Sequence, residues 1–249
     1  SPAPATPTPV GAVFTLSDGF DDWTPGEITP DTTVNGWNFI SGVAGDPAGQ
    51  VNFSVANTKM NQYLSIGRQA GATLPSMPVV SRTFSRMSSK FVVEFTVMVP
   101  ATATYYVKLE DSLNPNVPIQ VVMTATYIAV TNNANSAEVF KIVTNPIRTK
   151  PYRLKFEIDT WAEKYAVYVD GSRKDNQGAS PLHSFQRAKM YNWTGIDRIT
   201  AGSAASGTSF TNIGFDNVSV YATEQQITPT PVPTSTPVPP VMEYTLYES

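Results

Sequence analysis

The strongest constraint on the fold is an alternation of apolar and polar residues with a period of two. It recurs between residues 11 and 223 and is clearest in the segment 90–99, which Pro100 ends. Apolar side chains stand there at every second position: Phe91, Val93, Phe95, Val97 and Val99. Alternation combined with β-branched and aromatic residues predicts a β-strand with one buried face.

Further short runs of the same kind follow along the chain, at 105–110, 119–130, 137–143, 152–159, 165–169, 196–200 and 210–221. Asp170-Gly171, directly after the run 165–169, is a tight-turn signal. Helical periodicity is not convincing anywhere, and the best candidate, 184–191, is short enough to be a loop. Many short strands without intervening helices predict an all-β, antiparallel β-sandwich with little or no helix.

The prolines divide the chain into segments. Of the 21 prolines, four lie in the first ten residues and six in the segment 228–240, among Thr and Ser and without charges. Such Pro-Thr runs are extended and cannot build a core. We interpret 1–10 and 224–241 as linkers around a β-sandwich module at 11–223, although disordered ends are the simpler alternative.

A short internal repeat favours the linker interpretation. Phe14-Thr15-Leu16-Ser17-Asp18-Gly19 follows the first Pro-Thr run, and Tyr244-Thr245-Leu246-Tyr247-Glu248-Ser249 follows the second. Both read aromatic-Thr-Leu-x-acid-small. We therefore expect 242–249 to begin a following module, which this chain includes only in part, so that covalently linked neighbouring modules are among its partners.

Composition excludes several classes of function. The net charge is −3 and only 15% of residues are charged, so nucleic acid is not an expected partner. There is no Cys and one His, which excludes disulfide scaffolds, thiolate nucleophiles and His-cluster metal sites. No apolar stretch approaches the roughly 18 residues that a membrane span requires, so we expect no membrane partner.

Three motifs in order resemble a known superfamily. They are Gly19-Phe20-Asp21-Asp22-Trp23 with Gly36-Trp37, then 152–159 with the hairpin Tyr165-Ala166-Val167-Tyr168-Val169-Asp170-Gly171, and finally Phe215-Asp216-Asn217-Val218. This order is similar to the concanavalin A-like lectin/glucanase jelly roll over residues 13–221. With the Pro-Thr linkers, it resembles the non-catalytic modules of multimodular, secreted bacterial enzymes that degrade plant polysaccharides such as pectin and rhamnogalacturonan.

The superfamily includes glycoside hydrolases with a Glu-x-Asp-x-(x)-Glu signature on one strand, and Glu157, Asp159 and Glu163 approach it. Glu157 and Asp159 share a strand face, but position 161 is Trp and position 162 is Ala where the second Glu would stand. We interpret 160–164 as a hairpin loop and the acids as solvent-facing. A polysaccharide lyase could use Tyr106, Lys108 or Arg153 near calcium, but no spacing demands it.

Carbohydrate binding fits the remaining composition, because sugars need aromatic rings for their C–H faces and amides or charges for their hydroxyls. On the predicted strands, the polar positions include Tyr106, Lys108, Glu110, Gln120 and Glu94. If these strands are neighbours in one sheet, they form a polar face with an aromatic residue on it. Trp161 and Trp193 are alternative sugar platforms, whereas Trp23 and Trp37 are expected in the core.

The resemblance also implies a structural calcium. In many members of the superfamily the Asp of the closing motif binds the ion, and Asp216 matches that residue. Calcium takes six to eight oxygen ligands, and Asp18 and Asp21 are plausible partners because first and last strands of such sandwiches are often adjacent. The alternative is that Asp216 caps a turn.

Together these points predict a monomeric, extracellular module that binds plant cell-wall polysaccharide, pectic or hemicellulosic, and tethers a neighbouring enzyme through effective concentration. Two alternatives stay open: a catalytic module, either a lyase or an atypical hydrolase, and a structural spacer or adhesion module.

Overall fold

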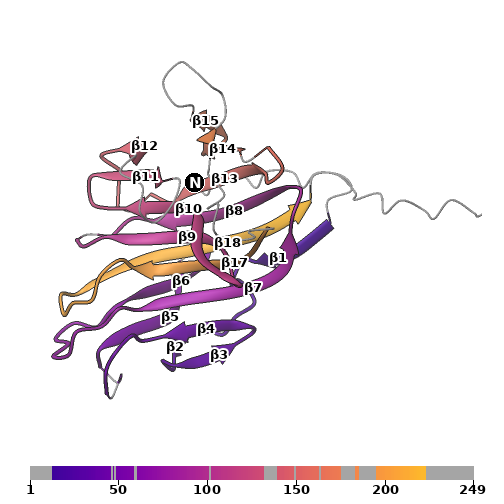
Figure 1. The fold of residues 1–249 in the computed structure, drawn as a ribbon. Coiled ribbons are helices and arrows are strands. Elements are labelled where there is room, and N and C mark those ends of the chain that lie inside the picture. The colour runs from indigo at the N-terminus through magenta and orange to yellow at the C-terminus, as the bar shows by residue number, and fades with distance from the viewer. Residues whose placement is uncertain are drawn as a thin grey trace, which may run out of the picture.

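The computed structural model describes residues 13–45, 47, 49–58, 61–100, 102–131, 139–148, 150–162, 164–174, 183–184 and 195–222. All regular structure in these residues is β-strand, in two antiparallel sheets stacked face to face (Figure 1). The predicted all-β antiparallel sandwich is confirmed. The predicted linkers and following module, Glu163, Trp193 and nearly all of the helix candidate 184–191 lie outside the described residues.

Sheet A is built around the long strand β18 (Thr211–Ala222), which β8 (Lys90–Met98) pairs along one side. Its other side pairs first with β6 (Asn61–Arg68) and then with β1 (Val13–Asp18), so that the first and last strands are neighbours. The sheet continues beyond these strands to two edges: on one side β13 (Tyr152–Asp159), β14 (Lys164–Val169), β15 (Ser172–Lys174) and β16 (His183–Ser184), on the other β5 (Val51–Thr58) and β2 (Gly26–Ile28).

Sheet B has the order β12-β11-β10-β9-β17-β7-β4-β3. Its strands are β12 (Val139–Thr144), β11 (Tyr127–Thr131), β10 (Asn114–Met123), β9 (Tyr105–Asp111), β17 (Ile196–Ser203), β7 (Val79–Met87), β4 (Trp37–Ile40) and β3 (Thr32–Val34). Neighbours far apart in sequence, such as β9 and β17, give the sheet the crossovers typical of a jelly roll.

The apolar run 119–130 is two strands rather than one. Thr124 starts a turn between β10 and β11, and its hydroxyl accepts hydrogen bonds from the backbone N–H groups of Thr126 and Tyr127. Hydroxyl side chains that bond to the backbone two or three residues on favour turns over strands. The apolar pattern hid this break because both strands are buried on the same face.

The core lies between the sheets and is continuous. Inward-facing residues of β13, such as Leu154 and Phe156, are fully buried, while Arg153 and Lys155 face out of the sandwich. Aromatic rings pass from one sheet to the other: Phe156 stacks on Phe95, which contacts Phe215, and Phe215 meets Trp37 edge-on. Such rings supply a large part of the apolar area that stabilises the fold.

One edge of the sandwich is formed by β2 and β3, which end sheets A and B respectively. Because β2 and β3 are consecutive in the chain, the connection between them crosses from one layer to the other. Figure 1 shows β2, β3 and β4 together at the lower end of the molecule, away from β12 and β15. This edge carries the candidate site.

Candidate functional site: a tryptophan-floored pocket at the sandwich edge

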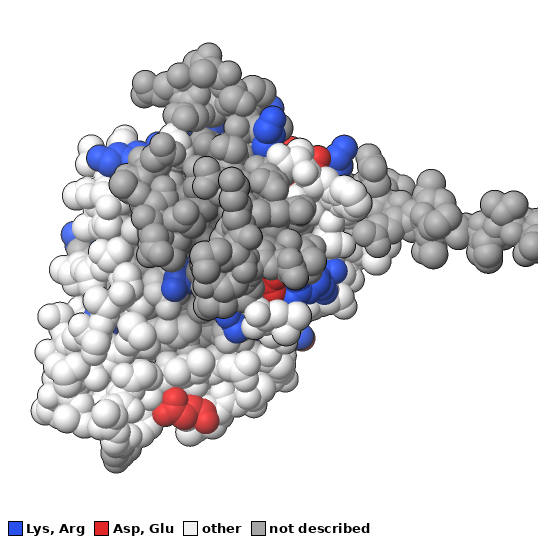
Figure 2. Space-filling view, viewed as in Figure 1, with Lys and Arg blue, Asp and Glu red and all other residues white. Residues whose placement is uncertain are grey.

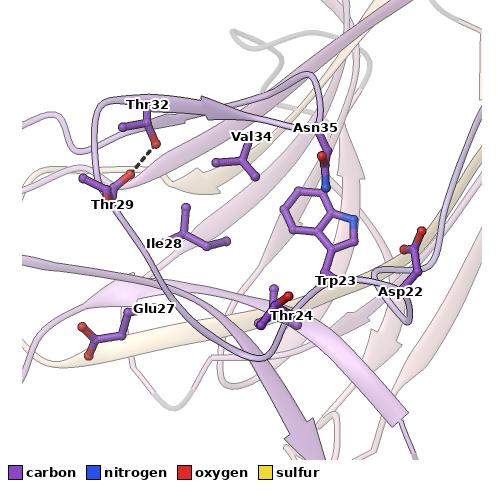
Figure 3. A pocket seen from close by; sticks show the side chains of 10 residues that line it. Asp22, Trp23, Thr24, Glu27, Ile28, Thr29, Thr32, Val34 and Asn35 are labelled. Carbon is purple, nitrogen blue, oxygen red and sulfur yellow. Dashed lines mark hydrogen bonds between the residues drawn. The ribbon is translucent and has the colours of Figure 1, made fainter.

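A surface pocket of about 510 Å³ lies between the edge strands β2 and β3 (Figure 3). We call it the Trp23 pocket. Its apolar lining comes from Trp23, Ile28, Val34 and Val55, and its polar lining from Asp22, Thr24, Glu27, Thr29, Thr32 and Asn35. The pocket therefore combines an apolar floor with a rim of hydroxyl, amide and carboxylate groups, which is typical of small-ligand sites.

Trp23 is held rigidly by the aromatic core. Its ring packs edge-on against Phe20 at 5.2 Å between centroids and against Phe39 at 6.4 Å, and the residue is only 8% exposed. Within the described part of the chain, its indole N–H has no hydrogen-bond partner. Figure 3 shows the indole nitrogen on the side of Asp22. Buried tryptophans usually satisfy this donor, so the pocket offers an N–H to a ligand.

The loop before Trp23 is fixed by Asp18 at the end of β1. One carboxylate oxygen, Oδ1, accepts a hydrogen bond of 3.0 Å from the backbone N–H of Phe20, and Oδ2 accepts one of 2.8 Å from the indole of Trp37. The N–H of Trp23 then closes a turn onto the carbonyl of Phe20 at 3.1 Å. These bonds set the direction in which Trp23 enters the edge of the sandwich.

The opposite wall is fixed by two turns. Asn35 and Gly36 both have positive φ, 48° and 80°, as a two-residue hairpin turn between β3 and β4 requires. Thr32 Oγ1 donates a hydrogen bond of 2.6 Å to the carbonyl of Thr29, and Asp31 accepts bonds from the N–H and hydroxyl of Ser41. The rim is thus preorganised, which lowers the entropic cost of binding.

The predicted residues on β9 and β10 do lie together on the outer face of sheet B. Lys108 pairs with Gln120 in register, and Thr200 of β17 lies on the other side of Lys108. Glu110 accepts a hydrogen bond of 3.0 Å from Arg198 and one from Thr200. The Lys108 ammonium lies 4.0 Å from the centroid of the Tyr106 ring, and Tyr106 is buried. That ring face is covered by Lys108 rather than open, and sugar binding here stays a prediction.

Glu94 does not belong to that face, because the condition that all these strands are neighbours in one sheet is not met. β8 lies in sheet A and β9 and β10 in sheet B, so Glu94 faces outward from the opposite layer. There its carboxylate is bonded by Arg153 Nε at 3.0 Å and by the hydroxyl of Tyr221 at 2.8 Å. Alternation defines the face of a strand but not the sheet it joins.

The tryptophan predictions have different outcomes. Trp37 is fully buried and Trp23 nearly so, as predicted. Trp161 lies in the β13–β14 loop, also as predicted, and is 80% exposed. Asp159 Oδ1 accepts hydrogen bonds from the N–H groups of Trp161 and Ala162, which defines the loop. Whether Trp161 contacts a sugar stays a prediction.

The carboxylates considered for catalysis have structural partners. Asp159 accepts the loop hydrogen bonds given above. Glu157 accepts hydrogen bonds from Lys155 Nζ at 2.6 Å and from the Tyr168 hydroxyl at 2.8 Å. Burial raises the pKa of Glu157, but these bonds outweigh it and leave the pKa below its ordinary value. A carboxyl group with a lowered pKa is unsuited to act as a general acid.

The three aspartates predicted for calcium are not gathered into one ligand set. No group of three or more His, Cys, Asp or Glu side chains among the described residues could hold a metal ion. Asp18 binds Phe20 and Trp37 as described, and the Asp216 oxygens accept hydrogen bonds of 2.8 Å from the backbone and side-chain amides of Asn217. Asp21 is exposed, and its carbonyl accepts a bond from Gln62.

Calcium therefore stays a prediction that thermal unfolding can test. An ion that binds only the native state raises the unfolding midpoint. If the chain holds calcium, a chelator lowers the midpoint and added calcium restores it. An unchanged midpoint would remove the metal from the account.

Sequence reasoning did not identify the Trp23 pocket. Two signals were available: the Asn35-Gly36 pair, which is a strong hairpin signal, and the polar residues that surround Trp23 in 21–24. Neither indicates that the edges of two sheets meet at this point.

No protein-family model matches this sequence, and no curated protein is detectably similar to it. Solved structures do match. A sialidase superposes with a TM-score of 0.61 at 15% identity over 84% of this chain, which spans 18% of the sialidase. The Bacillus licheniformis β-glucanase matches with a TM-score of 0.49 at 10% identity, over 87% of this chain and 100% of the glucanase. The carbohydrate-binding module CBM66 from Bacillus subtilis matches with a TM-score of 0.42 at 16% identity, over 78% of this chain and 99% of the module.

At these identities the similarity concerns the fold. The class that the fold and the pocket define is an all-β, antiparallel jelly-roll sandwich with a tryptophan-floored pocket at one edge. The described residues contain no helix with the length and hydrophobicity needed to span a bilayer.

Proposed function

We propose that this chain is a carbohydrate-binding module whose ligand site is the Trp23 pocket. The observation that carries the proposal is the lining of the pocket: an indole with an available N–H at its floor, surrounded by threonine hydroxyls, an amide and carboxylates. Sugars present C–H faces that pack on aromatic and aliphatic groups, and hydroxyls that both donate and accept hydrogen bonds. The rim supplies partners of both kinds.

The engagement of the two described acidic residues that approach the hydrolase signature, Glu157 and Asp159, supports a non-catalytic role. Glycoside hydrolysis requires two carboxyl groups that face one bond. Glu157 is bonded to Lys155 and Tyr168, and Asp159 holds the β13–β14 loop. Both side chains stabilise local structure or lie on a solvated sheet face. We therefore favour binding without cleavage over a hydrolase.

In the full proposal the module is extracellular and targets an attached enzyme to plant cell-wall polysaccharide. The support is the pair of Pro-Thr-rich segments at 1–10 and 224–241, whose composition is typical of interdomain linkers. A linker keeps the enzyme at high effective concentration near its substrate without new contacts to the reacting bond. Pectic and hemicellulosic polymers are the ligands that the resemblance to modules of plant-polysaccharide-degrading enzymes suggests.

Affinity electrophoresis against a panel of plant polysaccharides tests the proposal, with reducing-end and unsaturated-uronate assays in parallel. We expect retardation of the chain by at least one polymer and no product. Product release would instead establish a lyase or hydrolase. If the chain is not retarded by any polymer and releases no product, it is a spacer or a protein-binding module.

The position of the site is tested by a matched pair of variants. Asn35→Gly removes the rim amide and keeps the left-handed turn, since Asn35 has a φ of 48°. Asn145→Gly makes the same change at an exposed turn with a φ of 49°, outside the pocket. Loss of one or two hydrogen bonds to a ligand weakens binding about 5- to 100-fold. We expect this loss for Asn35→Gly only, and equal affinities would place the site elsewhere.

A further inference from the structure

We infer that the Trp23 pocket takes uncharged sugar residues and rejects those that carry a carboxylate. The inference rests on the proposed function and narrows it to neutral polysaccharides or neutral segments of mixed ones. Its starting point is the charge of the described lining residues, among which Asp22 and Glu27 are the charged side chains and there is no Lys or Arg. Both acids are exposed and therefore accessible to a ligand.

The acidic character extends over the whole N-terminal part of the chain. Residues 1–58 contain six Asp and Glu and no Lys or Arg, although the chain as a whole has 17 Lys and Arg. Figure 2 shows acidic and no basic side chains over the lower corner of the visible face, where β2 and β3 lie, and basic side chains higher up. A ligand that approaches this corner meets a negative field.

One cation that lies behind the rim, Arg82 on β7, is already engaged. Its guanidinium donates a hydrogen bond to the carbonyl of Asn35, lies 3.9 Å from the Asp18 carboxylate and packs over the ring of Trp37 at 5.9 Å. Asp18 offsets its charge, so that Asp22 and Glu27 dominate at the mouth of the pocket.

The hydrogen-bonding groups point to the same class of ligand. The Trp23 indole N–H needs an acceptor, and Asp22, which lies on the side of the indole nitrogen in Figure 3, needs a donor. A sugar hydroxyl can satisfy both groups at once. An ionised carboxylate satisfies the indole but cannot donate to Asp22, and it also faces a like charge, which costs binding free energy.

The test compares acidic polysaccharides with their carboxyl-reduced forms, so that each pair differs only in whether the sugar carries a carboxylate or a neutral hydroxymethyl group. Galacturonan and glucuronoxylan serve as probes beside a neutral panel of galactan, arabinan, xylan and glucans, by affinity electrophoresis of the intact chain. For each pair that is bound in either form, we expect about tenfold or greater preference for the reduced form, since one like-charge contact near a surface has this magnitude. Raising the salt concentration should reduce this preference, because salt screens the repulsion between like charges.

Two variants assign the selectivity to the pocket. Asp22→Asn and Glu27→Gln each remove one rim charge and should reduce the preference for the carboxyl-reduced form. Glu157→Gln removes one charge on the outer face of sheet A and should leave that preference unchanged. Binding of neutral polymers together with no binding of any free-acid form also supports the inference. Equal or tighter binding of the acidic forms would overturn it while the proposed function stands, and absence of binding to every polymer would overturn both.

Discussion

The Asp18 carboxylate connects three parts of the molecule. It ends β1, orders the loop that leads to Trp23 through the N–H of Phe20, and satisfies the indole N–H of the fully buried Trp37. Hydrogen bonds to an ionised, largely buried acceptor are among the stronger contributions to stability. Asp18, considered from the sequence as a partner of Asp216 in a calcium site, thus has a defined structural role through these two hydrogen bonds.

Asp18→Ala should lower the free energy of unfolding by about 2–4 kcal/mol, because it leaves the Trp37 donor buried without a partner and removes the bond to Phe20. Urea unfolding followed by tryptophan fluorescence measures the change. The control is Asp22→Asn in the same loop, which is exposed and should stay within about 0.5 kcal/mol of the parent. Similar losses for both variants would show that Asp18 has no such role.

At the residue scale, the sequence predicts burial better than function. Trp23 and Trp37 were expected in the core and are there, in line with the high average burial of tryptophan. The partner of each polar side chain was not predictable. Tyr106 and Glu110 have a sugar-binding pattern, yet Lys108 of the same strand covers the Tyr106 ring and Arg198 of β17 bonds to Glu110. The Arg198 contact depends on which strands become neighbours.

At the scale of elements, the β14–β15 hairpin follows its sequence signal closely. Asp170 and Gly171 were predicted as a tight turn, and they have φ values of 49° and 79°. Asp170 also accepts a hydrogen bond from the N–H of Arg153 and one from Lys150. A two-residue turn with both residues left-handed matches the twist of the flanking strands.

Gly171→Ala should cost about 1 kcal/mol of stability through backbone strain alone, since a Cβ at this position would meet no atom within 4 Å. Gly19→Ala is the matched control: its backbone is not left-handed and its Cβ would make ordinary contacts of 3.4 and 3.5 Å. Denaturant midpoints compare the two. A larger effect for Gly19→Ala would contradict this account of the turn.

The strands of the N-terminal half were largely not predicted. β5 and β7 are interior strands of their sheets, yet they contain Asn and Ser, which are not among the residues that strengthen a propensity-based strand signal. The edge strands β2 and β3 have three residues each, too few for any periodicity. Since the candidate site lies between these two strands, it could not be predicted from the pattern.

At the scale of the whole molecule, the burial of tyrosine hydroxyls in both sheets is expected to set the alkaline limit of stability. Burial raises the pKa of Tyr105 to about 12, and burial followed by the charge of Glu110 raises that of Tyr106 to about 12. Burial also raises the pKa values of Tyr165 and Tyr221. In the unfolded chain tyrosine ionises near pH 10.

The unfolded state therefore loses protons before the native state does, and stability that is fully present below about pH 10 falls as the pH rises toward about 12. Unfolding free energies measured by urea titration from pH 8 to 11.5 should show this decline. Tyr106→Phe removes one ionisable group from the buried set and should make the decline shallower. A constant free energy up to pH 11.5 would contradict the burial of these hydroxyls.

The central claim is that a sugar binds at Trp23, and the indole N–H resonances of the ¹⁵N-labelled chain test it most directly. The chain has four tryptophans, so each indole can be assigned by substitution. On titration with an oligosaccharide from the polymer bound most tightly, the Trp23 indole signal should shift, while that of Trp37, bonded to Asp18, should stay. A Trp23 signal that remains in place while that of Trp161 or Trp193 moves would contradict the account.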